Sequence, residues 1–537
     1  MFQTWSINPH LPLEYYHLSL ISLLHILTWS YCLTIKGWVS DDILGIAQFS
    51  DHLVKDEKID YYEIDQKDKN GKPIRIKNVG WNKYLGWPSC FMRWFRLQIG
   101  KTFRDLGKNS SGHTIYGYVQ DARKHHALNI ITQWAILLLS YNLLSVLFGT
   151  KLAFVATLLY CVHPCLVQTV GWISGVNYLF SMFWALVGFN CVLYIHNPYL
   201  IFPIVAICTL FSCFTLLPGC FNFIIFLMMG YYNCALIALL VGTYSMITLG
   251  KWSVDFRIKA FKDQDMAKST IIYFRKLIII VKTFWYYVRL TFFPKRMGLF
   301  HTWGYHFEDP IEHIDNEFWL GLVSLIIYGT LILLCPKPVQ FGLVWGFIYL
   351  IIFSNIITAN QFVSERYIAN SLLGICLALA YILQYYPIVT AFIVGVAIMR
   401  IWVHLPTFQN EVRFYESNCF NFPESEVAMG NLGVSYLNHG MHFKCTDTWL
   451  EASRQNPLYD VPWYNLYTLC KQNGDLQGAH RFLTMCLKAK TVHFKENWKT
   501  EMEQLNILIS IQGNVQDFSK KLNQAIVEGH YERTGIV

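Results

Sequence analysis

The stretch that decides the fold class is His126-Ala-Leu-Asn-Ile-Ile-Thr-Gln-Trp-Ala-Ile-Leu-Leu-Leu-Ser-Tyr-Asn-Leu-Leu-Ser-Val-Leu-Phe148. It contains no Asp, Glu, Lys or Arg, and a helix of about 20 apolar residues crosses the hydrocarbon core of a bilayer. Similar runs lie near 15–36, 151–163, 172–195, 199–217, 221–250, 271–293, 317–335, 340–358, 368–384 and 387–404. We therefore expect an all-α, polytopic membrane domain over residues 1–404, with about eleven spans.

The composition supports an integral membrane protein. Of the 537 residues, 54% are hydrophobic and only 15% are charged, whereas a soluble protein carries about 25% charged residues. The net charge of +8 is spread along the chain, which fits cytoplasmic loops and anionic head groups and predicts no nucleic-acid partner. The 15 cysteines include no CxxC pair, so neither a zinc site nor a disulfide framework is indicated.

The basic loop 251–270 indicates the orientation of the chain. It holds Lys251, Arg257, Lys259, Lys262 and Lys268 between two spans, and such loops stay in the cytoplasm. Counting spans from it places the N-terminus in the cytoplasm, and the long loop 37–125 and the C-terminus on the lumenal or periplasmic side. The membrane is that of the endoplasmic reticulum in a eukaryote and the inner membrane in a bacterium. The count assumes one tilted span at 221–250; a broken pair split at Gly230 is the alternative.

Two further segments are amphipathic or repeated. Residues Trp87–Leu106 alternate aromatic and basic side chains, which predicts a helix on the membrane surface that could also steer a lipid substrate. Residues 405–537 align with themselves at a shift of 34, matching Asn431 with Asn465, Leu432 with Leu466 and Gly440 with Gly474. That period is typical of tetratricopeptide repeats, in which Gly ends the first helix and Ala479 lets the second pack closely.

We expect two copies and a degenerate third in 495–530. Their concave face would bind a protein acceptor or partner; alternatively, the array is short and only caps the membrane domain.

Charged motifs next to the apolar runs are the candidates for chemistry, because carboxylates and guanidinium groups are costly near a membrane. Asp41 and Asp42 open the long loop, and Glu365 and Arg366 precede a late span. Alternatively, Asp41 and Asp42 only mark a solvated helix end, and Glu365 and Arg366 only form an ion pair at the end of a span. His125, His126, His301, His306 and His313 lack the spacing of metal ligands and are expected in solvated loops.

Five motifs occur in a recognisable order: Asp41-Asp42-Ile-Leu-Gly-Ile46, His126-Ala-Leu-Asn129, His163-Pro164 followed by Trp172, Tyr287-Val-Arg-Leu-Thr-Phe-Phe-Pro294, and Ser364-Glu365-Arg366-Tyr367. With the repeats after them, they resemble the transmembrane O-mannosyltransferases that carry tetratricopeptide repeats. These belong to the polytopic glycosyltransferases of the GT-C fold, which use polyprenyl-phosphate sugars. The resemblance covers almost the whole chain.

The resemblance implies transfer of a hexose, mannose in this family, from a polyprenyl-phosphate donor to a Ser or Thr hydroxyl of a protein, with inversion. The lipid-linked sugar is a substrate, and no cofactor or metal is expected. A departing phosphate needs no general acid, so the reaction needs one carboxylate base and one fixed cation.

We assign the base to Asp41 or Asp42. Arg366 would bind the donor phosphate, held in place by Glu365, and Arg289 is a second candidate cation. His126, Asn129 and His163 are supporting residues; His163-Pro164 alternatively only shapes a helix end.

Several positions depart from the family pattern. Gln168 replaces a Glu, Gln133 replaces a His, and Val176 and Tyr178 replace an Arg and an Asp. These neutral residues favour an alternative: a membrane scaffold of the same fold that has lost catalysis and docks a partner through its repeats. The retained charges of Asp41, Asp42, Glu365 and Arg366 favour the enzyme.

Overall fold

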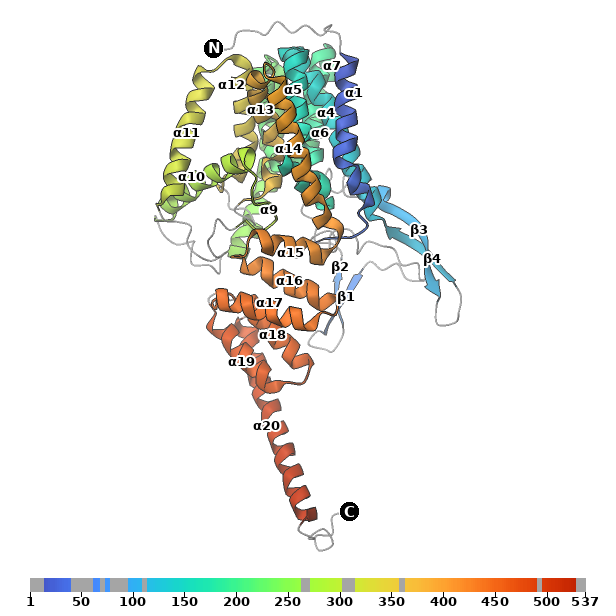
Figure 1. Ribbon diagram of the computed structural model, residues 1–537, viewed down its shortest axis with the longest axis vertical. Coiled ribbons are helices and arrows are strands. Elements are labelled where there is room, and N and C mark those ends of the chain that lie inside the picture. The colour runs from blue at the N-terminus through green and yellow to red at the C-terminus, as the bar shows by residue number, and fades with distance from the viewer. Residues whose placement is uncertain are drawn as a thin grey trace. The chain divides into compact units, whose positions relative to one another are not determined.

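The computed structural model describes residues 14–39, 61–67, 73–77, 95–108, 114–261, 271–301, 314–356, 363–489 and 495–527. The chain is predominantly helical (Figure 1) and divides into two compact units. The membrane unit holds Met1–Ala260, Lys268–His301 and Ile311–Asn421, and the C-terminal unit consists mainly of Phe422–Val537. Helix α15 (Glu411–Asn421) therefore belongs to the membrane unit, although the sequence analysis ended that domain at residue 404.

Among the described residues, seven helices are long and apolar enough to cross a membrane. They are α1 with the turn after it (Tyr15–Thr34), α4 (Ala122–Phe148), α6 with the turn before it (Ile173–Tyr194), α7 (Pro198–Thr215), α11 (Asn316–Leu334), α13 (Glu365–Leu383) and α14 with the turn after it (Pro387–Gln409). An eighth results if α5 (Thr150–Cys161) and Pro164–Gly171, which meet at a bend of 55°, form one span. The chain is thus a membrane protein by the length and apolarity of its helices.

Three of the predicted spans do not form a single helix that is both long and apolar enough to cross a membrane. Helix α10 (Ile271–Phe292) carries Lys282 and Arg289 and is not among the seven. Helix α12 (Lys337–Leu350) is apolar but shorter than a span. The run 221–250 is broken into α8 (Asn222–Met228) and α9 (Tyr232–Phe261).

The break between α8 and α9 lies at Gly230, whose φ of 84° is in the left-handed region that glycine adopts without strain. The alternative of a broken pair is therefore the correct one. The orientation derived above assumed a single span at this position, so it stays a prediction.

Helix α13 lies inside the membrane unit and positions the candidate site. It packs against α5 and α12, and the Trp345 indole of α12 donates to the Asn370 carbonyl at 2.9 Å. Most of α13 is buried (61%), whereas α11 is almost wholly exposed (6% buried). Because α13 begins at Glu365, directly after the extended residue Ser364, its first turn brings Glu365 and Arg366 into the interior of the unit.

The long first loop adds two short antiparallel hairpins to the helical fold. Strands β1 (Tyr61–Lys67) and β2 (Pro73–Lys77) form one antiparallel hairpin, and β3 (Lys101–Lys108) and β4 (Thr114–Gln120) form another. The expected amphipathic helix is described only over 95–100, after which β3 begins. Its residues 101–105 pair with Tyr116, Gly117, Tyr118, Val119 and Gln120 of β4. Tyrosine and valine favour strands.

The C-terminal unit begins with two helix pairs at the predicted period. Helices α16 (Glu426–Asn438) and α18 (Asp460–Gln472) begin 34 residues apart, as do α17 (His442–Gln455) and α19 (Leu476–Lys488). Gly440 and Gly474, with φ of 74° and 76°, follow the first helix of each pair, as predicted. Ala479 is fully buried between α18 and α19.

A third pair is absent from the described part of 495–530. These residues form one helix instead, α20 (Lys495–Val527). Membership of the tetratricopeptide class stays a prediction.

Candidate functional site

The Arg366 guanidinium lies among aromatic rings in the first turn of α13. Its Cζ atom is 4.9 Å from the Trp172 ring centroid and 5.2 Å from that of Tyr367. Tyr367 stacks on Phe353 with ring centroids 4.5 Å apart, and Tyr178 lies 6.3 Å from Tyr367. We call Trp172, Tyr178, Phe353, Arg366 and Tyr367 the arginine–aromatic cluster. Such contacts orient a cation through the negative faces of the rings.

Asn129 positions Trp172 within this cluster. Its Nδ2 atom donates to the main-chain carbonyls of Thr169, Val170 and Trp172 at 3.4, 3.3 and 3.0 Å. Thr169 and Val170 lie in the π-helical turn Val167–Gly171, and Trp172 follows it. Asn129, a predicted supporting residue, therefore contacts the site through the main chain of this turn.

The segment that follows α1 and its turn also reaches the cluster. The Trp172 indole Nε1 donates to the Val39 carbonyl at 3.4 Å, and Val39 is 2% exposed. The candidate bases Asp41 and Asp42 follow two and three residues later and lie outside the described residues.

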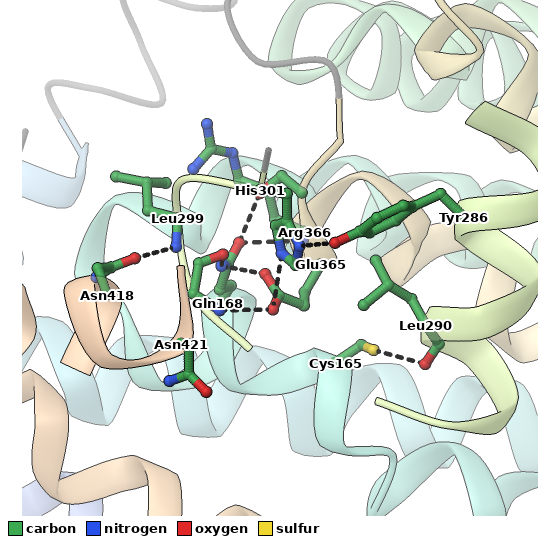
Figure 2. A network of polar contacts seen from close by, with 12 residues as sticks. Cys165, Gln168, Tyr286, Leu290, Leu299, His301, Glu365, Arg366, Asn418 and Asn421 are labelled. Carbon is green, nitrogen blue, oxygen red and sulfur yellow. Dashed lines mark hydrogen bonds and ion pairs between the residues drawn. The ribbon is translucent and has the colours of Figure 1, made fainter. Parts of the chain in front are cut away.

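The carboxylate of Glu365 is fully buried and bonded to groups other than Arg366 (Figure 2). Its Oε1 atom accepts from the Gly298 amide at 2.8 Å and lies 3.0 Å from His301 Nε2. Its Oε2 atom accepts from Gln168 Nε2. The expectation that Glu365 holds the Arg366 side chain is therefore wrong: although adjacent in the chain, the two side chains enter different surroundings.

His301 extends this arrangement to α10, because its Nδ1 atom lies 2.8 Å from the Tyr286 hydroxyl. We call Gln168, Tyr286, Gly298, His301 and Glu365 the Glu365 network. The expected position of His301 in a solvated loop is wrong, because its side chain is fully buried. The nearby carboxylate explains the difference, since a buried acid needs N–H donors.

Gln168 links this network to the main chain of Arg366. Its Nε2 atom donates to the Gly298 carbonyl at 2.7 Å in addition to Glu365. Its Oε1 atom accepts from Ser364 Oγ at 2.7 Å and from the Arg366 amide at 3.3 Å. The side chain is 3% exposed. A position that the sequence analysis noted only as a departure from a family pattern is thus central to the site.

The other predicted residues have structural roles. His163 Nε2 lies 3.0 Å from the Thr291 carbonyl, and its Nδ1 accepts from the Cys165 amide at 3.3 Å. His163 therefore caps a short turn and ties it to the end of α10, which is the alternative that the sequence left open.

His125 and His126 are 1% and 2% exposed and are not solvated loop residues. His125 pairs with Gln120 at 3.0 Å. Within the described chain, neither ring nitrogen of His126 has a hydrogen-bond partner.

Arg289 lies at the contact between α10 and α11. It pairs with Glu317 at 2.9 Å and is about half exposed (46%), while its Cζ is 5.4 Å from the Tyr286 ring. Two turns earlier in α10, Lys282 pairs with Asp315 at 2.6 Å. These two ion pairs join the helices, and Arg289 approaches the Glu365 network at the Tyr286 ring.

A cavity of about 210 Å³ lies where α1 ends and α4 begins, lined by Lys36, Trp38, Gln120, Asp121, Ala122 and Arg123. It does not include a residue of the arginine–aromatic cluster. Among the residues that the structure describes, no group of His, Cys, Asp or Glu side chains is arranged to hold a metal ion.

Comparison of the chain with protein-family profiles, curated proteins and solved structures finds no match. The resemblance drawn from the five motifs therefore stays a prediction, as do the donor, the acceptor and the reaction.

Proposed function

We propose that this chain is a membrane glycosyltransferase that moves a hexose, mannose by resemblance, from a polyprenyl phosphate to a hydroxyl of a protein acceptor. In this proposal Arg366 binds the phosphate of the donor. Asp41 or Asp42 removes the proton of the acceptor hydroxyl as that oxygen attacks the anomeric carbon. The sugar–phosphate bond breaks on the opposite face, and the polyprenyl phosphate departs as an anion, which gives inversion.

The observation that carries the proposal is the position of Trp172 between two distant parts of the chain. Its indole N–H bonds to the Val39 carbonyl, and its ring lies against the Arg366 guanidinium. Two peptide units, about 7 Å of extended chain, separate Val39 from Asp41. A base and a phosphate clamp must flank a single anomeric carbon, and this chain length is compatible with such an arrangement.

The surroundings of Arg366 suit a phosphate clamp. A guanidinium that lies against aromatic rings keeps its five N–H donors in its own plane and matches phosphate oxygens in a forked geometry. A fixed cation next to the departing phosphate stabilises the charge that develops there, and this is the largest contribution that a protein makes in many such reactions.

In this proposal, three residues named from the sequence take other roles. Glu365 becomes a buried anchor of the α13 first turn, because its oxygens accept from Gly298 and Gln168. Arg289 becomes part of the joint between α10 and α11. His163 becomes a cap of the turn that precedes Gln168. Only Arg366 keeps the role of phosphate ligand.

The test of the proposal is sugar transfer by the purified chain in nanodiscs, with a polyprenyl-phosphate mannose as donor and a Ser/Thr-rich peptide as acceptor. We expect transfer by the parental protein and a loss of about 10²–10⁴-fold in rate for Asp41→Asn or Asp42→Asn, because the amide cannot accept the proton. Asp447→Asn, an exposed position in α17, is the matched control. Equal rates for all three variants would exclude both aspartates as the base.

The scaffold alternative predicts a different result in the same experiment. The parental protein would then transfer no sugar, and a partner protein would co-purify with the full chain but not with one ending at Asn421.

A further inference from the structure

Gln168 is the residue of the membrane unit whose side chain joins the first turn of α13 to the segment that contains Gly298 and His301 (Figure 2). We propose that Gln168 is the positioning residue of Arg366, and that an uncharged amide at this point keeps the donor-binding site active across the neutral pH range. This inference rests on the proposed function, since it concerns the residue that would bind the donor phosphate.

The hydrogen bonds of Gln168 specify an amide. Its two N–H donors go to the Gly298 carbonyl and the Glu365 carboxylate, and its oxygen accepts from the Ser364 hydroxyl and the Arg366 amide. The side-chain amide of glutamine offers two donors and two acceptor sites, so all four are used. A carboxylate at this position would have no hydrogen for Gly298 and would face the Glu365 carboxylate.

The segment Val167–Trp172 holds Arg366 at two points. Gln168 binds its main-chain amide, and Trp172, four residues later, lies against its guanidinium. Gly175 allows this segment to fold back on itself, because a Cβ atom there would lie 2.3 Å from the Gln168 carbonyl oxygen. The direction of the Arg366 side chain therefore depends on where Gln168 places its backbone.

The Glu365 carboxyl group is surrounded by polar atoms from three other parts of the membrane unit. His301 Nε2 lies 3.0 Å from Glu365 Oε1, and His301 Nδ1 lies 2.8 Å from the Tyr286 hydroxyl. The two oxygens of Glu365 also accept from Gly298 and Gln168. Among the described residues, the titratable groups that face this carboxylate are Cys165 before the π-helical turn, Tyr286 of α10, His301, and His404 of α14, and Arg400 lies near Cys165 and His404.

Gln168→Glu tests the role of the amide. Two carboxyl groups at hydrogen-bond distance repel each other when both are ionised, so the folded variant holds one proton more than the parental protein until the pH is high enough to remove it. We expect near-parental transfer at pH 5.5, where the pair shares that proton. At pH 8 the repulsion displaces the first turn of α13, and the KM for the polyprenyl-phosphate sugar rises at least tenfold.

Two further variants separate charge from packing. The double variant Q168E/E365Q again pairs one carboxylate with one amide, and we expect it to lose the pH dependence and to bring the donor KM within about threefold of the parental value. Gln168→Leu removes the hydrogen bonds without adding charge, and should raise the donor KM equally at both pH values. Gln472→Glu, at an exposed position in α18, is the matched control and should behave as the parental protein.

Thermal unfolding of the purified variants tests the inference independently of transfer. Because folded Q168E binds more protons than its unfolded chain, its melting temperature should fall relative to the parental protein as pH rises from 5.5 to 8. This measurement remains informative if the parental protein transfers no sugar, a result that would refute the proposed function alone.

The inference would be overturned if Q168E had the same pH profile of sugar transfer and the same melting curve as the parental protein. If Q168E fails to accumulate in membranes, the double variant Q168E/E365Q decides the question. Accumulation of the double variant supports the pairing of residue 168 with residue 365, and failure of both variants to accumulate overturns the inference.

Discussion

Replacing Arg366 with lysine keeps a positive charge in the arginine–aromatic cluster but removes the planar fork. The guanidinium lies 4.9 Å from the Trp172 ring and 5.2 Å from the Tyr367 ring. A lysine ammonium is a compact, strongly hydrated charge that carries three donors and cannot present a forked pair to a phosphate. The Arg366→Lys variant therefore tests whether the geometry of Arg366, and not only its charge, supports transfer.

The expected loss has two parts. One charge-assisted hydrogen bond to the phosphate contributes about 1.5–3 kcal/mol, and the weaker cation–π contact of lysine costs about 0.5–1 kcal/mol at a partly buried site. Together these give about 2–4 kcal/mol. At about 1.4 kcal/mol per factor of ten, kcat/KM should fall by about 30- to 700-fold.

The assay is the initial rate of mannose transfer in nanodiscs over a range of donor concentrations. Because negative charge grows on the phosphate as the sugar leaves, we expect most of the loss in kcat and a smaller rise in KM. Arg454→Lys, an exposed arginine of the C-terminal unit (side chain 73% exposed), controls for the substitution itself.

The reasoning about Arg366 would be refuted by a kcat/KM within threefold of the parental value while the protein remains folded. A variant that transfers normally to the acceptor would show that the forked geometry of Arg366 is not required. The half-exposed Arg289 would then be the next candidate for a forked contact with the phosphate.

Two further predictions concern the C-terminal unit. A chain ending at Asn421 should bind the lipid donor as the full chain does but lose transfer to a protein acceptor; unchanged transfer would exclude acceptor recognition by the helix pairs. The cut must follow α15, because Asn418 accepts from the Leu299 amide at 2.6 Å, close to His301 and Glu365. Burial raises the pKa of Cys445 to about 11 and that of Cys486 to about 12. At pH 8 both thiols should therefore resist iodoacetamide while the unit is folded and should react after unfolding, as measured by mass spectrometry. The partly exposed Cys470 should react first. Equal reaction rates of Cys445 and Cys486 in the folded and unfolded states would contradict the packing of α16–α19.

Local patterns predicted much of the helical architecture. The apolar runs gave the positions of most helices in the membrane unit, since a helix that crosses a bilayer must satisfy its main chain internally and cover itself with apolar side chains. The period of 34 and the positions of Gly440 and Gly474 predicted the helix pairs, since glycine adopts positive φ without strain at a helix end. The break at Gly230 remained open, because a single glycine is compatible with a continuous helix.

The composition of the site was less predictable. Arg366, Asn129 and Trp172 were identified from short motifs, but their partners Val39, Tyr178 and Phe353 come from distant parts of the chain. His301 is buried 3.0 Å from the Glu365 carboxyl group, and nothing in its own neighbours along the chain indicates this.

By itself, the sequence determined that this is a helical membrane protein with charged residues kept at the ends of apolar runs, because those properties depend on composition and local periodicity. Only the tertiary structure decided which charges act together. It separated Glu365 from Arg366, adjacent in the chain, because consecutive helix positions lie about 100° apart around the axis and point into different surroundings. It joined Gln168, Gly298 and Glu365, far apart in the chain, because each buried polar atom must find a partner wherever the packing of helices supplies one.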